Sequence, residues 1–161
     1  MDFINRTATI IMADDDPEEL LISLRAFRDL KFPGNLRYVQ DGANLIKYLN
    51  KSVTYFGNSY YLIPDLVLLD LKMLVKNGWK TLKEIKNSQA LRNIPVAVWA
   101  TSNEDKGRSR SIETGADYFL KKPDVYADLL HSLCLLIEKY CGNNEDGDIE
   151  IPVPAGKKQY Q

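Results

Sequence analysis

The sequence is short of cysteine and histidine, has no excess of charge of either sign, and contains no long apolar run. Its 161 residues include two cysteines and one histidine, and 21 Lys and Arg nearly balance 22 Asp and Glu, for a net charge of −1. Without a basic surface, general binding to nucleic acid is not expected. No apolar stretch approaches membrane-spanning length, so we also expect no membrane partner.

The two cysteines, Cys134 and Cys141, fall in one segment with helical spacing. Their helical rise would separate them by roughly 10 Å, which is too far for a disulfide. Unpaired thiols and the lack of a recognisable signal peptide indicate a reducing compartment, so we expect a soluble, cytoplasmic protein. The single histidine, His131, lies among apolar residues and is expected to be a surface or packing residue rather than a ligand.

Short apolar runs and helical patterns alternate five times along the chain. Strands are expected at 8–13, 36–39, 66–70, 94–99 and 118–121. Helices are expected at 17–31, around 45–49, around 79–85, at 104–114 and at 125–140. Hydrophobic residues at 45% and charged residues at 27% are usual for a globular chain. The alternation predicts one α/β domain with a parallel sheet and helices on both faces.

The segment that ends in Asp70 is the most informative. Five of the six residues in 66–71 are aliphatic, with Pro64 before them and Asn77 and Gly78 soon after. Such a short run is typical of a strand buried on both faces. Asp70 would then lie at the carboxyl end of a buried parallel strand, where open α/β sheets carry their functional groups.

Several polar groups are expected to meet Asp70 at that edge. Asp14 and Asp15 follow the first strand, and Lys122 follows the fifth. Carboxylates this close would raise at least one pKa, and a hard divalent cation such as Mg²⁺ would relieve the repulsion. A metal beside Asp70 would also suit attack of this carboxylate on a phosphoryl group.

The acidic pair has an alternative, purely structural role. Asp14 and Asp15 could simply cap the first helix. Asp16 is placed to accept the capping hydrogen bond, and Pro17 suits the first helical position. The two acidic residues that follow complement the helix dipole; these are Glu18 and Glu19.

Three segments leave alternatives open. The polar and aromatic connection 51–63 is long for its place, which favours either a surface function or a tolerated insertion with hydrophobic anchoring. Residues 142–161 have no periodicity and are expected to form a disordered tail without an output domain. The last helix is apolar at Leu130 and Cys134 as well as on its inner face. This pattern is compatible with a homodimer, but core packing explains most of it.

Together these motifs resemble those of a response-regulator receiver domain of two-component signalling, over residues 7–141. The matching residues, in order, are Asp14 and Asp15, then 70–73 with Gly78, then Gly115 and Ala116 before Lys122 and Pro123. The resemblance implies a flavodoxin-like, doubly wound sheet with strand order 2-1-3-4-5. The long segment before Pro64 and the lack of an output domain are similar to stand-alone receivers associated with bacterial phytochromes.

The resemblance also implies a role for each site residue. Asp70 would accept a phosphoryl group from a sensor histidine kinase or a histidine phosphotransfer protein. Asp15, Asp70 and the backbone carbonyl of Lys72 would bind Mg²⁺ directly, and Asp14 would act mainly through a metal-bound water. Lys122 would pair with the phosphoryl group. Such a domain signals by protein–protein contact and is not an enzyme in the usual sense.

The sequence departs from the receiver pattern where a switching hydroxyl is expected. Receivers usually carry Thr or Ser at the end of the fourth strand, and Ala100 stands there. Thr101 is an alternative source through a shifted loop, although strand alternation directs it to the other face. Leu74 replaces a common Pro, and Phe119 cannot supply a phenol. These departures leave open a second function, a degenerate receiver that acts as a phosphorylation-independent adaptor.

A metal-dependent phosphohydrolase with an aspartyl nucleophile is a third possibility. Such enzymes generally need an acid-base carboxylate two residues after the nucleophile, and Lys72 occupies that position. The sequence therefore favours the receiver over the hydrolase.

Overall fold

Five strands alternate with five helices over the part of the chain that the computed structural model describes, residues 7–55, 57, 60–73, 77–100 and 105–142. The strands are β1 (Thr9–Ala13), β2 (Asn35–Val39), β3 (Leu66–Asp70), β4 (Val96–Ala100) and β5 (Tyr118–Lys121). The helices are α1 (Pro17–Asp29), α2 (Gly42–Thr54), α3 (Gly78–Asn87), α4 (Asp105–Thr114) and α5 (Tyr126–Cys141).

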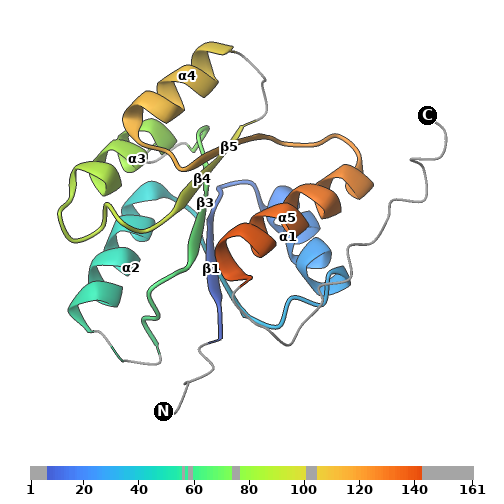
Figure 1. Cartoon of the computed structure of the whole chain (residues 1–161), viewed down its shortest axis with the longest axis horizontal. Helices are drawn as coiled ribbons and strands as arrows, with labels where there is room; N and C mark the ends of the chain where they lie inside the picture. Colours follow the sequence, from blue (N-terminus) through green and yellow to red (C-terminus); the bar gives the residue numbers. More distant parts are fainter. Residues whose placement is uncertain (1–6, 56, 58–59, 74–76, 101–104, 143–161) are drawn as a thin grey trace.

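The strands form one sheet in the order β2-β1-β3-β4-β5, and every neighbouring pair is parallel. This is the predicted flavodoxin-like order, with β3 in the centre. Figure 1 shows α1 and α5 on one face of the sheet and α2 and α3 on the other, with α4 beyond α3. All residues of β1, β3 and β4 are buried, as expected for strands that are covered on both sides.

Strand alternation divides the core into two clusters. Val67, Leu69 and Ala100 belong to the cluster under α2 and α3. Leu68 and Trp99 belong to the cluster under α1 and α5. Because successive strand residues point to opposite faces, Asp70 follows the parity of Leu68 and faces the α1 side.

The expected start of α1 is confirmed. The Asp16 side chain accepts a hydrogen bond from the N–H of Glu18 at 2.9 Å, and Pro17 is the first helical residue. Asp41 caps α2 in the same way through the N–H of Asn44 at 2.7 Å. These caps fix where α1 and α2 leave the carboxyl edge of the sheet.

Several predicted boundaries were wrong. Helix α1 ends at Asp29, not at 31. The fourth strand begins at Val96, not at 94, and ends at Ala100, one residue beyond the predicted end at 99. Pro95 has no N–H to donate, whereas the Lys122 N–H donates to the Ala100 carbonyl at 2.6 Å and continues the pairing. The second helix extends to Thr54, and the Tyr55 N–H donates to the Lys51 carbonyl at 2.9 Å to close its last turn.

The shortened connection after α2 is anchored by aromatic contacts. The Tyr48 hydroxyl donates to the Leu62 carbonyl at 2.8 Å, and the Tyr48 and Tyr61 rings meet edge to face at 6.1 Å. A groove of about 480 Å³ lies beside it, and Lys47 and Lys51 are among its lining residues. The contacts fit the interpretation of an insertion with hydrophobic anchoring.

Helix α5 buries most of its apolar residues against the sheet, although Leu135 is exposed. Leu133 and Cys134 are fully buried, so the expectation that Cys134 adds to an outward apolar face was wrong. Leu130 packs at the edge of the same core cluster, and both cysteines are free thiols. Among the described residues, no helix is long and apolar enough to cross a membrane. Residues 143–161, the predicted tail beyond Gly142, lie outside the described part.

Candidate functional site

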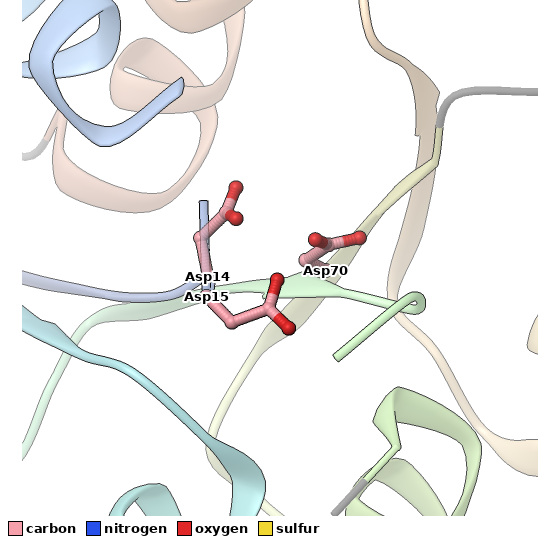
Figure 2. Close-up of side chains that lie close together, drawn as sticks. All are labelled: Asp14, Asp15 and Asp70. Atoms are coloured by element: carbon pink, nitrogen blue, oxygen red, sulfur yellow. The ribbon is translucent and has the colours of Figure 1, made fainter. Parts of the chain in front are cut away.

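Three carboxylates meet at the carboxyl edge of the sheet. Asp14 and Asp15 directly follow β1, and Asp70 is the last residue of the neighbouring strand β3. Each offers an oxygen within 4.8 Å of the others, and Figure 2 shows Asp15 and Asp70 converging beside Asp14. Asp14 is 5% exposed and Asp70 is 4% exposed. The prediction that Asp14, Asp15 and Asp70 lie close together is confirmed.

Backbone N–H groups orient two of the carboxylates. Asp14 Oδ1 accepts from the Asp16 N–H at 2.9 Å, and Asp70 Oδ1 accepts from the Lys72 N–H at 3.0 Å. These bonds leave the second oxygen of each carboxylate free to face the site, and both of those oxygens face Lys122.

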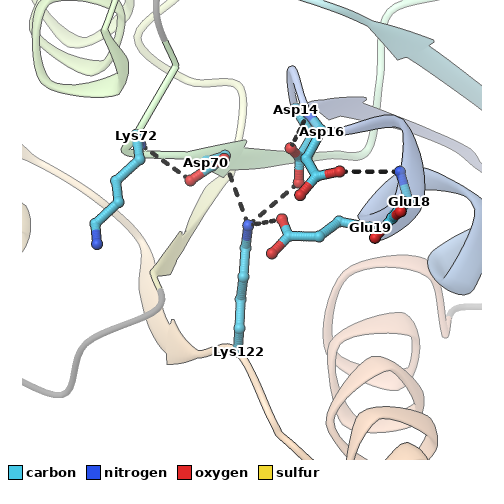
Figure 3. Close-up of polar contacts among 7 residues, drawn as sticks. All are labelled: Asp14, Asp16, Glu18, Glu19, Asp70, Lys72 and Lys122. Carbon is cyan, nitrogen blue, oxygen red and sulfur yellow. Dashed lines mark hydrogen bonds and ion pairs between the residues drawn. The ribbon is translucent and has the colours of Figure 1, made fainter.

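The Lys122 ammonium group lies among carboxylates from three segments. Its Nζ is 3.3 Å from Asp14 Oδ2 and 3.4 Å from Asp70 Oδ2, and it also bonds Glu19 Oε2 (Figure 3). Lys122 is 10% exposed, which is low for a lysine. As predicted, the residue after β5 therefore reaches Asp70.

The sequence did not identify Glu19 as a site residue. Its position in the first turn of α1 suggested only a favourable interaction with the helix dipole. In the structure, Glu19 lies in the capped first turn of α1 and contacts Lys122, a residue 103 positions later. The only sequence feature that pointed to Glu19 was its position about one helical turn after the acidic run 14–16.

Burial has the largest effect on the pKa values of Asp70, Asp14 and Lys122. It raises the pKa of Asp70, while the Lys72 N–H and the Lys122 charge oppose this rise. It also raises the pKa of Asp14, against the Asp16 N–H and Lys122. Burial lowers the pKa of Lys122, but the Glu19 hydrogen bond and the surrounding carboxylate charges outweigh it and the pKa is raised overall. Lys122 thus remains a firmly charged partner for anionic oxygen.

The donor set fits a hard divalent cation. Oxygens of Asp14, Asp15 and Asp70 lie close enough to share one ion, and Mg²⁺ takes oxygen ligands. A cation would also offset the excess of negative charge that one lysine cannot balance. Direct coordination by the Lys72 carbonyl stays a prediction.

The structure describes two of the four remaining predicted positions, Ala100 and Phe119. Ala100 is buried at the end of β4, one residue beyond Trp99, which pairs with Asp70. Phe119 is also buried, in the core cluster that includes Ala100. Thr101 and Leu74 lie outside the described residues.

Gly78, one of the receiver-like motif residues, has a clear steric role. A Cβ on Gly78 would lie 2.4 Å from the Asp70 carbonyl oxygen and 2.5 Å from Leu71 Cα. Both distances are far below contact distance, so only glycine lets α3 start this close to the end of β3.

Comparisons with known proteins agree with this geometry. Residues 10–133 match the response regulator receiver domain family. The probable methanogenesis regulatory protein FilR2 of Methanothrix harundinacea is 32% identical over 84% of this chain and 84% of its own length. Response regulator Rcp1 of Synechocystis sp. is 27% identical over 78% of this chain and 83% of its own length.

Solved structures show the same fold. The phosphorylated cyanobacterial phytochrome response regulator RcpA superposes with a TM-score of 0.74 at 25% identity, covering 86% of this chain and 97% of RcpA. The Mn²⁺-bound form of Rcp1 superposes with a TM-score of 0.67 at 25% identity, covering 83% of this chain and 94% of Rcp1. With its sheet order, acidic cluster and family match, this chain belongs to the response regulator receiver domains of two-component systems.

Proposed function

We propose that this chain is a receiver that accepts a phosphoryl group on Asp70 in a Mg²⁺-dependent step. The observation that carries the proposal is a buried Asp70 with Lys122 Nζ 3.4 Å away and two further carboxylates beside it. Receiver domains are signalling domains rather than classical enzymes, so the expected chemistry is one transfer to the domain itself.

The donor is a phosphohistidine of a sensor histidine kinase or a histidine phosphotransfer protein. An Asp70 carboxylate oxygen attacks phosphorus, the P–O bond forms as the P–N bond breaks, and the leaving imidazole takes up a proton. Lys122 binds a phosphoryl oxygen, while the Lys72 N–H holds the carboxylate in place. One P–O bond replaces one P–N bond, and the transfer requires no further reactant.

The carboxylates of Asp14, Asp15 and Asp70, with the Lys72 carbonyl, would hold the metal ion. When bound, Mg²⁺ neutralises charge on the phosphoryl oxygens. By analogy, the Mn²⁺-bound Rcp1 structure supports binding of a divalent metal, and the phosphorylated RcpA structure supports phosphorylation.

Incubation with acetyl phosphate and Mg²⁺ should add one phosphate to the intact protein, detected by mass spectrometry. Asp70→Asn should take none. Asp65→Asn removes a carboxylate at the opposite edge of the sheet, where it accepts from the Thr9 N–H, and should be phosphorylated like wild type. Equal phosphate on Asp70→Asn, or none on wild type with either acetyl phosphate or a kinase, would overturn the proposal.

A phosphorylation-independent adaptor is the second candidate, and Ala100 favours it. The side chain at this strand end is buried and offers no hydroxyl to a phosphoryl group. An adaptor predicts that the wild type and Asp70→Asn bind a partner protein equally well in the presence of acetyl phosphate. A phosphate-driven receiver predicts a difference between the two.

A further inference from the structure

Glu19 brings α1 into contact with the candidate site. Its carboxylate bonds Lys122 Nζ, although Glu19 itself is 33% exposed and Lys122 is 10% exposed. Figure 3 shows the ammonium group between Glu19, Asp14 and Asp70. An ammonium group has three N–H donors, and here three carboxylates surround it.

A phosphoryl oxygen on Asp70 therefore has to compete for Lys122. Asp14 cannot easily withdraw, because it is buried and its other oxygen is bonded to the Asp16 N–H. Glu19 is the most exposed of the three carboxylates and has the longest side chain, so water can replace Lys122 as its partner at the smallest cost.

We propose that Glu19 is a positioning residue that holds Lys122 before phosphorylation and competes with the phosphoryl group for it. This inference rests on the proposed function of Asp70. Because Glu19 belongs to the first turn of α1, its release links the phosphoryl group to that helix without a hydroxyl at residue 100.

Glu19→Gln is the informative substitution, because it keeps the side-chain length and removes the charge. The variant should free Lys122 for the phosphoryl group and reduce repulsion against an incoming anion. Glu18→Gln is the matched control. Glu18 is the neighbouring residue, carries the same charge and is exposed, and its backbone N–H bonds Asp16.

The test uses beryllofluoride as the phosphoryl analogue at saturating Mg²⁺, with intrinsic fluorescence as the readout of binding. The expected result is affinity about three- to tenfold tighter for Glu19→Gln than for wild type, with Glu18→Gln within about twofold. The affinity for Mg²⁺ alone should stay equal or weaken in Glu19→Gln. A merely structural role of Glu19 would weaken both affinities together.

The outcomes separate the two proposals. If wild type binds beryllofluoride and Glu19→Gln binds it equally well or more weakly, the role of Glu19 is wrong while Asp70 stands. If wild type neither binds beryllofluoride nor takes phosphate, the proposed function itself fails. Thermal melting of each variant identifies any general loss of folding.

Discussion

At the scale of single residues, Asp70 works against the stability of the fold that holds it. Burial raises its pKa, which means that the ionised carboxylate is disfavoured in the folded protein at neutral pH. Lys122 and the Lys72 N–H offset this cost only in part. The site is therefore suited to bind a cation or accept a group rather than to stabilise the metal-free domain.

Asp70→Asn should stabilise the metal-free protein by about 1 kcal/mol, or about 2–4 °C in Tm. The amide oxygen can still accept the Lys72 N–H, while the buried charge is removed. Thermal melting in EDTA measures this difference. In excess Mg²⁺ the order should reverse, because only wild type keeps all three carboxylates. A lower Tm for Asp70→Asn in EDTA would contradict the argument.

The two thiols should be almost inert in the folded protein. Cys134 is 0% exposed, and burial, with a smaller effect of the Asp65 charge, raises the pKa of the Cys141 thiol to about 12. Thiolate is the reactive form, so an aromatic disulfide reagent near pH 8 should react about 100-fold more slowly with native than with urea-unfolded protein. One thiol reacting equally fast in both states would contradict the predicted environment.

At the scale of elements, the fit of α3 against the end of β3 positions Asp70. Gly78 begins α3 and its N–H donates to the Leu71 carbonyl at 3.2 Å. The absence of a Cβ allows this approach. The motif glycine is thus explained by contact with the backbone that carries the Asp70 carboxylate.

Gly78→Ala should lower the free energy of unfolding by about 2 kcal/mol or more, since the backbone of β3 must shift to accept the methyl group. Gly107→Ala is the control, because Gly107 lies within α4 and an added Cβ would meet nothing within 4 Å. That change should stabilise by up to about 1 kcal/mol through helix propensity. Urea denaturation of both variants tests the contrast, and a similar effect at the two sites would refute it.

At the scale of the whole molecule, a nearly neutral chain concentrates negative charge in one place. The net charge is −1, yet Asp14, Asp70 and Glu19 surround a single lysine, and Asp15 lies beside Asp14 and Asp70. The sheet order produces this concentration, because β1 and β3 are adjacent and end at the same edge. The stability of the molecule should therefore depend on pH and on divalent cations together.

In EDTA, wild type should gain stability relative to Asp70→Asn as pH falls from about 7 to about 5. The folded pKa of Asp70 is raised, so the native state binds more protons than the unfolded state in this range, and the stability contribution is lost as pH rises. Excess Mg²⁺ should invert the trend, because protons compete with the metal. Urea denaturation midpoints of wild type and Asp70→Asn at each pH measure this difference in stability. A difference that does not change with pH in EDTA would contradict the prediction.

Much of the fold and site could be predicted because it depends on local patterns. Alternating apolar runs and helical spacing gave the five strands and five helices, and the resemblance gave their order. Asp14, Asp15, Asp70 and Lys122 were brought together by one rule, that parallel strands end at a common edge. The Asp16 cap was equally local, since it needs only its own helix turn.

Only the tertiary structure decided which partners the side chains have across the fold. The Glu19–Lys122 contact joins residues 103 positions apart, and the burial of Cys134 depends on how α5 is rotated against the sheet. The close contact at Gly78 is likewise a matter of packing. The sequence by itself determined which groups reach the edge of the sheet, because periodicity is encoded locally; their partners depend on packing between distant segments, which no local pattern specifies.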